Sequence, residues 1–337
     1  MPTRSLLVLA GVLLSAAACR DETVSPTEPT WSATGPEAAV ISNTWLVKRD
    51  LWTNQYSDFA AATVTDAAGQ STVYVIGGRS STFGSLGKVM AYTVASNTWS
   101  AKAPLPISLY RSNGAAVING RIYISGGVRK YKSYQDRLYV YDPAANSWTA
   151  KHVMPTNGFD GLTGVINNQL YVVTGCHSQE EDCGLYYPGG DHPDRWLFRY
   201  DPPTDTWTEL AVPPFFGAPV GGTIGGKLFL GVPGSSVLHV YDPATNLWTE
   251  RPIPRVIRSG SAFVTLGAKL YMIGGYQGVT AVRTTSVYDP ATNAWTNKAP
   301  LPTARAWGAA ARVVVGGQIG IELVAGARPG NNLQYRP

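Results

Sequence analysis

The ten residues Tyr139–Trp148 read Tyr-Val-Tyr-Asp-Pro-Ala-Ala-Asn-Ser-Trp, and this unit recurs along the chain. The other copies are Met90–Trp99, Phe198–Trp207, His239–Trp248 and Ser286–Trp295. Asp and Pro start a turn, Asn accepts the left-handed backbone conformation, and Trp returns on the next strand. The unit therefore predicts a β-hairpin, and its tryptophans are spaced about 49 residues apart on average.

A second unit lies upstream of each hairpin and consists of a short apolar run rich in aromatic and β-branched residues. Its copies are Thr72–Gly78, Arg121–Gly127, Gln169–Gly175, Lys227–Val232 and Lys269–Gly275. Such runs are typical of strands that are buried on both faces. Turn dipeptides such as Asn119-Gly120 and Gly225-Gly226 precede them and predict a tight hairpin. Two hairpins in each repeat predict a four-stranded sheet.

This repeat resembles the kelch repeat over roughly residues 39–337. The resemblance implies an all-β fold, a kelch-type β-propeller in which each repeat forms one blade. A last half-repeat begins at Gly308 and ends before its fourth strand, while Ile41–Trp45 looks like a fourth strand without its hairpin. The sequence therefore predicts six blades, with the N-terminal strand closing the last one and protecting two sheet edges.

Composition agrees with this fold class and excludes several others. The chain has 337 residues with 36 Gly, 24 Pro and 15% charged residues, which disfavours a helical bundle or a coiled coil. Its 10 Trp and 18 Tyr are incompatible with general disorder. The net charge of +5 is mild and no basic run appears, so no nucleic-acid partner is expected.

The N-terminus predicts export and a lipid anchor. Residues 1–18 have a basic start at Arg4, a short apolar core and a small-residue end, as in a signal peptide. The following Ala16–Cys19 resembles the lipobox of bacterial lipoproteins, which implies acylation of Cys19; the alternative is an ordinary signal peptide cut nearby. Residues 19–38 then form the lipidated cysteine and a flexible linker before the propeller at 39–337. Arg20 fits sorting to the outer membrane.

In a propeller the loops inside each blade and the loops between blades meet on one face, and function concentrates on such loops. From the repeat register we expect a ligand-binding set near the axis on this face. Its members are Tyr56, Arg111, Asp160, Arg258, Arg305 and Trp307. Arginine forks suit carboxylates and aromatic rings suit sugar faces, so the set predicts an anionic ligand such as an acidic sugar. The alternative is that the arginines brace neighbouring loops through backbone carbonyls.

One unusual loop contains Cys176 and Cys183. In an exported protein, two cysteines this close predict a local disulfide bond. A metal site with His177 and His192 is the alternative, but the spacing is unlike that of zinc sites. We therefore expect no metal.

No catalytic motif is present: there is no HExxH, phosphate loop or nucleotide fingerprint, and we expect no cofactor. The copper site of galactose oxidase, a kelch-like enzyme, cannot be mapped onto this chain. The hypothesis is a monomeric, membrane-anchored binding module of the cell envelope that engages a glycan or an envelope protein. The alternative is a carbohydrate-active enzyme like the exported sialic acid mutarotases, which this chain resembles in blade number and compartment.

Overall fold

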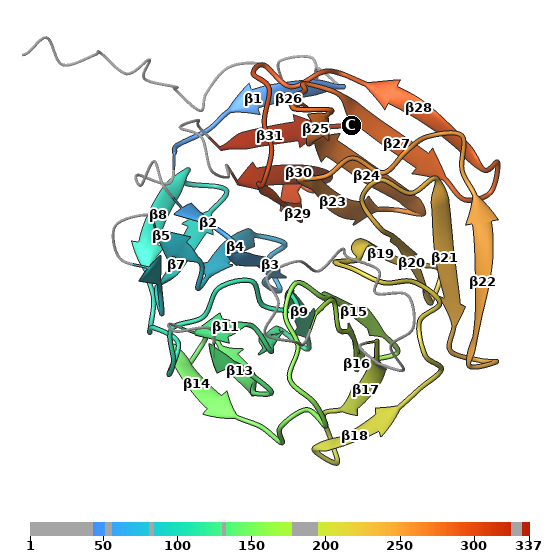
Figure 1. The fold of residues 1–337 in the computed structure, drawn as a ribbon. Coiled ribbons are helices and arrows are strands. Elements are labelled where there is room, and N and C mark those ends of the chain that lie inside the picture. Colours follow the sequence, from blue (N-terminus) through green and yellow to red (C-terminus); the bar gives the residue numbers. More distant parts are fainter. Residues whose placement is uncertain (1–42, 51–55, 81–83, 130–132, 177–194, 325–331) are drawn as a thin grey trace, which may run out of the picture. The chain divides into compact units, whose positions relative to one another are not determined.

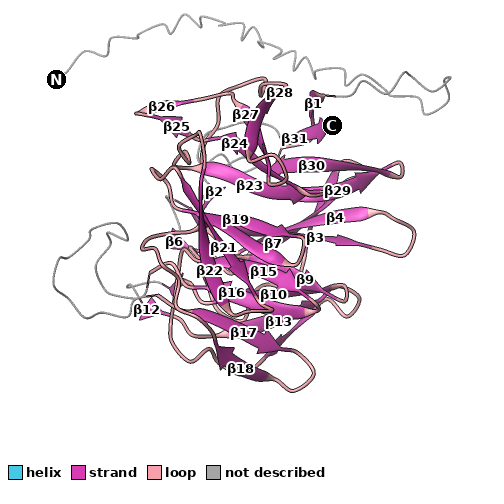
Figure 2. Cartoon of the chain, turned by 90° about the vertical axis from the view of Figure 1, so that its right-hand side faces the viewer, coloured by secondary structure: helices cyan, strands magenta, loops and turns pink. Residues whose placement is uncertain are grey.

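In the part of the chain that the structure describes, the regular structure consists of β-strands alone (Figure 2). The computed structural model describes residues 43–50, 56–80, 84–129, 133–176, 195–324 and 332–337. Among these residues, no helix is long and apolar enough to cross a membrane.

Six antiparallel sheets of four strands form the blades (Figure 1). Blade 1 contains β3 (Ala60–Thr65), β4 (Ser71–Ile76), β7 (Val89–Thr93) and β8 (Thr98–Ala101). Blade 2 contains β9 (Ala115–Ile118), β10 (Arg121–Ser125), β13 (Leu138–Asp142) and β14 (Ser147–Ala150). Blade 3 contains β15 (Leu162–Ile166), β16 (Gln169–Val173), β17 (Leu197–Asp201) and β18 (Thr206–Glu209).

The second half of the chain continues the pattern. Blade 4 contains β19 (Val220–Ile224), β20 (Lys227–Gly231), β21 (Val237–Asp242) and β22 (Leu247–Pro252). Blade 5 contains β23 (Ser261–Leu266), β24 (Lys269–Gly274), β27 (Thr285–Asp289) and β28 (Ala294–Lys298). Blade 6 contains β29 (Ala309–Val315), β30 (Gln318–Val324), β31 (Leu333–Arg336) and β1 (Thr44–Val47).

The blades form a closed ring. Their first strands contact one another in the order β3, β9, β15, β19, β23 and β29, and β29 contacts β3 again. Apolar side chains of neighbouring blades pack between the sheets, as Ile76 of blade 1 does with Ile122 of blade 2. The structure thus confirms the six-bladed β-propeller.

The antiparallel order gives the propeller two different ends. The hairpins that join first to second and third to fourth strands lie at one end, which we call the turn face. The connections between second and third strands, and between blades, lie at the other end, the loop face. Three small sheets decorate the loop face: β2 (Tyr56–Ser57) with β5 (Arg79–Ser80) and β6 (Gly84–Ser85), β11 (Val128–Arg129) with β12 (Ser133–Tyr134), and β25 (Tyr276–Gln277) with β26 (Thr280–Ala281).

The repeated Tyr, Asn and Trp explain why each outer hairpin forms. In blade 2, Asn146 has a φ of 47°, and its side chain accepts a 2.6 Å hydrogen bond from the Tyr141 hydroxyl. The same oxygen accepts the Ala103 N–H, and Trp148 Nε1 donates to the Ala103 carbonyl. The unit therefore stabilises its own turn and also binds the connection from the preceding blade. Each of these hydrogen bonds contributes roughly 0.5–1.5 kcal/mol to the free energy of unfolding.

The N-terminal strand completes blade 6 with the same contacts. β1 pairs with β31, and Trp45 lies opposite Tyr335. The Tyr335 hydroxyl donates to Asn43 Oδ1 over 2.9 Å, and Trp45 Nε1 donates to the Ala299 carbonyl over 3.0 Å. Asn43 and Trp45 thus supply the half-hairpin that the C-terminus lacks, and the predicted closure by the N-terminal strand is confirmed.

The seam between blades 6 and 1 differs from the other seams because it contains a buried carboxyl group. Glu322 occupies the second-strand position at which the other blades have Tyr74, Tyr123, Tyr171, Phe229 and Tyr271. It lies opposite Gln334, and both side chains are 0% exposed. Gln334 Nε2 donates to Glu322 Oε2 over 3.4 Å, while Glu322 Oε1 has no partner. Burial raises the pKa of Glu322 to about 8.

Candidate functional site

A series of left-handed residues marks the inner edge of the loop face. Asp58, Arg111, Asp160, Gly260 and Trp307 have φ values between 50° and 66° and lie just before first strands. Backbone hydrogen bonds join them from blade to blade: Arg111 N–H donates to the Asp58 carbonyl, Asp160 N–H to that of Arg111, and Trp307 N–H to that of Gly260. This conformation is uncommon outside glycine, and such residues concentrate at functional sites.

These bonds change the expected register. Asp58, Gly260 and Trp307 are equivalent to Arg111, whereas Arg258 and Arg305 lie two residues earlier. The predicted set therefore combines two positions of the repeat, with Arg111, Asp160 and Trp307 at one and Arg258 and Arg305 two residues earlier. Tyr56 also precedes the left-handed position; it begins β2, whose backbone pairs with β5.

The half of the loop face in blades 1–3 is ion-paired. Arg111 Nε donates to Asp160 Oδ2 over 2.7 Å, and a second guanidinium nitrogen contacts the same oxygen. Arg79 Nε lies 2.8 Å from Asp58 Oδ2. Arg111 also lies over the Phe159 ring, with 5.0 Å from its guanidinium carbon to the ring centroid. A ligand carboxylate at Arg111 would have to compete with Asp160, so these side chains are already neutralised.

Five connections of blades 4–6 together carry positive charge without acidic residues, whereas the connection from blade 6 to blade 1 contains Asp50. The five cover residues 210–219, 232–236, 253–260, 275–284 and 299–308, and none of them contains Asp, Glu or His. They contain four arginines, namely Arg255, Arg258, Arg283 and Arg305. This asymmetry between the two halves was visible in the sequence and is absent from the predicted site.

Three of these arginines donate to neutral acceptors. Arg258 donates to the carbonyls of Gly274, Met272 and Thr284 at 2.7, 3.3 and 3.2 Å. Arg283 Nε donates to the Leu301 carbonyl, and Arg255 donates to Ser286 Oγ at 3.0 Å. Carbonyls and hydroxyls hold a guanidinium in place but do not cancel its charge. Arg258 thus acts as a brace, the alternative considered for it.

Arg305 is the arginine of this half with spare donor capacity. Its Nε is buried and has no hydrogen-bond partner within the described residues. Burial lowers its pKa, and the Asp50 carboxylate opposes that effect. Its backbone carbonyl accepts the N–H of Gly275 over 2.8 Å, which fixes the loop against blade 5. An unpaired guanidinium nitrogen is costly to bury and is a candidate for binding an external acceptor.

Exposed aromatic rings lie on the same half. Trp307 is 51% exposed, and its ring centroid lies 6.3 Å from that of Tyr276. Gly260 packs against the Trp307 ring, since a Cβ there would approach it to 3.2 Å. Phe216 is 49% exposed, with the Arg195 guanidinium 3.9 Å from its centroid. Trp307 and Tyr276 thus present neighbouring aromatic rings on this half of the loop face.

The remaining predicted sites fall wholly or partly outside the described residues. Cys19 and Cys183 lie outside the described residues. Cys176 is disulfide-bonded, and its backbone exchanges two 2.9 Å hydrogen bonds with Phe159, next to Asp160. In the described part of the chain, no group of three or more His, Cys, Asp or Glu side chains could hold a metal ion.

Comparisons with known proteins agree with the fold. Models of the kelch motif match residues 110–150 and 258–302. The solved structure of YjhT is similar with a TM-score of 0.64 and 18% sequence identity, and the match covers 86% of this chain and 94% of that chain. The comparison with curated proteins found no significant match. The repeats, the six closed blades and the two motif matches together show that this chain is a kelch-repeat β-propeller protein.

Proposed function

We propose that the protein is a non-catalytic binding module of the bacterial cell envelope, anchored through Cys19, that holds an acidic glycan on the loop face of blades 4–6. The observation that carries this proposal is the charge asymmetry of the face. Arg255, Arg258 and Arg283 donate to neutral acceptors, and Arg305 is acted on by Asp50, whereas Arg79 and Arg111 in blades 1–3 are ion-paired.

An anionic group is the chemical complement of this half. Arginine forms charge-assisted hydrogen bonds with carboxylates, each contributing roughly 1.5–3 kcal/mol where water is partly excluded. Trp307 and Tyr276 supply flat apolar surface with polar edges, which suits the face of a sugar ring. Charge and ring surface together favour an acidic sugar over a simple anion.

A sugar-isomerising enzyme would need a group that accepts and returns a proton near the anomeric carbon. Residues 210–219, 232–236, 253–260, 275–284 and 299–308 contain no Asp, Glu or His. The nearest candidate in the predicted set, Asp160, is already bonded to Arg111 in blade 3. This chemistry supports binding rather than catalysis.

A glycan array probed with the purified protein tests the proposal. We expect the wild type to bind acidic glycans on the array. The affinity of the Trp307→Ala variant for these glycans should be lower by about tenfold or more, which corresponds to about 1.4 kcal/mol of binding free energy. Ile319→Ala is the matched control, because Ile319 is 42% exposed near the turn-face hairpin of blade 6. Retention of neutral glycans alone would refute the proposal, as would equal binding by both variants. Capture of an envelope protein by the wild type alone, without acidic glycans, would replace the glycan with that partner.

A further inference from the structure

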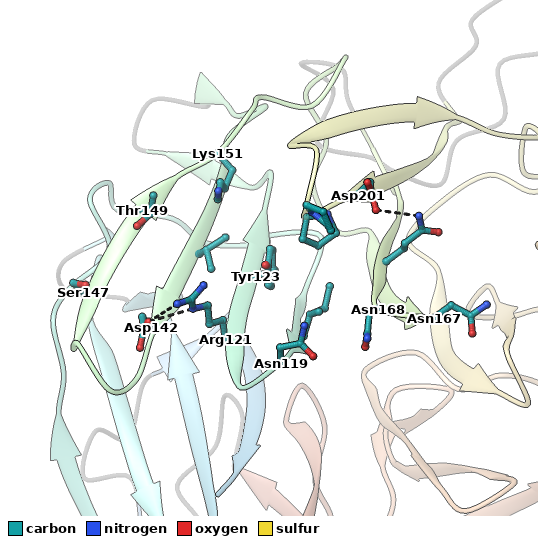
Figure 3. A pocket seen from close by; sticks show the side chains of 15 residues that line it. Asn119, Arg121, Tyr123, Asp142, Ser147, Thr149, Lys151, Asn167, Asn168 and Asp201 are labelled. Carbon is teal, nitrogen blue, oxygen red and sulfur yellow. Dashed lines mark hydrogen bonds and ion pairs between the residues drawn. The ribbon is translucent and has the colours of Figure 1, made fainter.

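A groove of about 540 Å³ lies between blades 2 and 3 on the turn face, away from the loop connections (Figure 3). Its floor includes Tyr123 and Val140, and one side carries the exposed Thr149 together with Lys151. The other side is formed by the tips of blade 3, including Asn167 and Pro203. Ligand pockets of about 300–1,000 Å³ are typical of proteins that bind small molecules, so the groove has room for one.

The groove is open because neither of two positions carries an arginine that reaches across the seam between blades 2 and 3. Val140 lies opposite Tyr123, and the equivalent residue opposite Tyr171 in blade 3 is Arg199. Arg199 acts electrostatically on Tyr241, so it lies in the seam between blades 3 and 4. Valine, which also holds this position in blades 4 and 5 as Val240 and Val287, is too short to fill the corresponding space between blades 2 and 3.

Lys151 holds the second position, at which blades 1 and 5 also have a lysine, Lys102 and Lys298. The equivalent residue in blade 4 is Arg251, whose guanidinium donates to the Pro290 carbonyl of blade 5 over 2.6 Å. Arg251 thereby bridges its seam. The Lys151 ammonium makes no hydrogen bond or ion pair with the described residues of blade 3, and its side chain lines the groove (Figure 3).

The charges in the groove cancel. Arg121 Nε and one terminal nitrogen each lie 3.1 Å from Asp142 Oδ2. Gln169 donates to Asp201 over 3.2 Å, as the dashed line in Figure 3 shows. Arg121 and Lys151 balance Asp142 and Asp201, so no net charge is left for an ion. The rim of the groove carries hydroxyl, amide, ammonium and carboxylate groups. They surround the aromatic ring of the floor and the side formed by Pro202 and Pro203.

We propose that this groove is a second binding site, which takes a short neutral saccharide. Sugar hydroxyls both donate and accept hydrogen bonds, as the groups of the rim do, while the Tyr123 ring and the prolines offer apolar surface to the carbon faces of the ring. The site is independent of the loop face and of the acidic ligand proposed there.

Saturation-transfer NMR with maltose, lactose and di-N-acetylchitobiose tests this site on the full-length protein. We expect at least one of these disaccharides to bind at millimolar concentration. Thr149→Trp places an indole in the groove from an exposed position, so the fold is retained, and should weaken binding by about tenfold or more. Thr208→Trp is the matched control, since Thr208 holds the same exposed place in β18 of blade 3.

The outcomes separate the two sites. Loss of disaccharide binding in Thr149→Trp, with binding intact in Thr208→Trp and in Trp307→Ala, supports the groove. Saturation of none of the three disaccharides by the wild type would overturn the proposal. Equal loss in both tryptophan variants, or loss in Trp307→Ala instead, would also overturn it, because the saccharide would then be bound elsewhere.

Discussion

Replacing Glu322 with Gln should make the protein more stable, and increasingly so as the pH rises. The carboxyl group is 0% exposed between blades 6 and 1, and one of its oxygens has no partner. Burial raises its pKa from 4.5 to about 8, against the opposing charge of Lys48. Burial also lowers the pKa of Lys48, and Tyr92 faces the same seam from blade 1. Glutamine keeps the shape of the side chain but has no charge to bury.

The size of the effect follows from proton linkage. Below pH 4.5 the carboxyl is protonated in both the folded and the unfolded chain and has no effect on the pH dependence. Between pH 4.5 and about 8 the folded chain keeps a proton that the unfolded chain has lost, so stability falls by about 1.4 kcal/mol per pH unit. Above pH 8 the loss is complete and amounts to an upper bound of about 5 kcal/mol.

Urea unfolding of the wild type and Glu322→Gln, in steps from about pH 5 to about pH 9, measures this difference directly. The two free energies of unfolding should be close near pH 5, diverge as the pH rises and stay apart above pH 8. Glu250→Gln is the control, because the Glu250 side chain is 64% exposed in β22 and should follow the wild type. Parallel curves for all three proteins would refute the reasoning.

Four further predictions concern the fold and its anchor. Arg258→Ala removes three hydrogen bonds to backbone carbonyls, so the free energy of unfolding should fall by about 1–3 kcal/mol in denaturant titrations. A chain that starts at residue 50 lacks β1 and should melt at a lower temperature or aggregate; unchanged melting would contradict closure by β1. Cys19→Ser should leave the membrane fraction on cell fractionation, and a wild type that is already soluble would disprove the anchor. Mass spectrometry of unreduced peptides should show Cys176 bonded to Cys183, whereas a different partner for Cys176 would disprove the pairing.

The blades were predictable because their stabilising contacts are local. Tyr141, Asn146 and Trp148 lie within one hairpin, and their hydrogen bonds require only that spacing. The same spacing predicted that Trp45 belongs to blade 6, whose other strands lie at the C-terminal end of the chain. Tyr335 is the Tyr of that repeat, and Asn43 and Trp45 supply its Asn and Trp. One copy of the unit would be a weak indication, but its recurrence along the chain predicts the fold.

The site was less predictable because the connections before the first strands differ in length. Arg111 is followed by Ser-Asn-Gly before β9, whereas Trp307 is followed by a single Gly before β29. Alignment by residue type therefore matched Arg258 and Arg305, rather than Gly260 and Trp307, with Arg111, although Trp307 was included in the predicted set as an aromatic residue. The acceptor that each arginine meets also depends on loops from the neighbouring blade, and a repeat pattern carries no such information.

The central claim is that the loop face of blades 4–6 binds an acidic glycan. The most direct test is calorimetric titration of the protein with the acidic glycan to which it binds most strongly on the array. The account predicts a measurable affinity for the wild type, an affinity weaker by about tenfold or more for Trp307→Ala, and an unchanged affinity for Thr149→Trp on the turn face. Binding should also weaken as salt is added, since arginine charges contribute to it. An affinity that survives in Trp307→Ala but is lost in Thr149→Trp would contradict the account, as would the absence of binding to any acidic glycan.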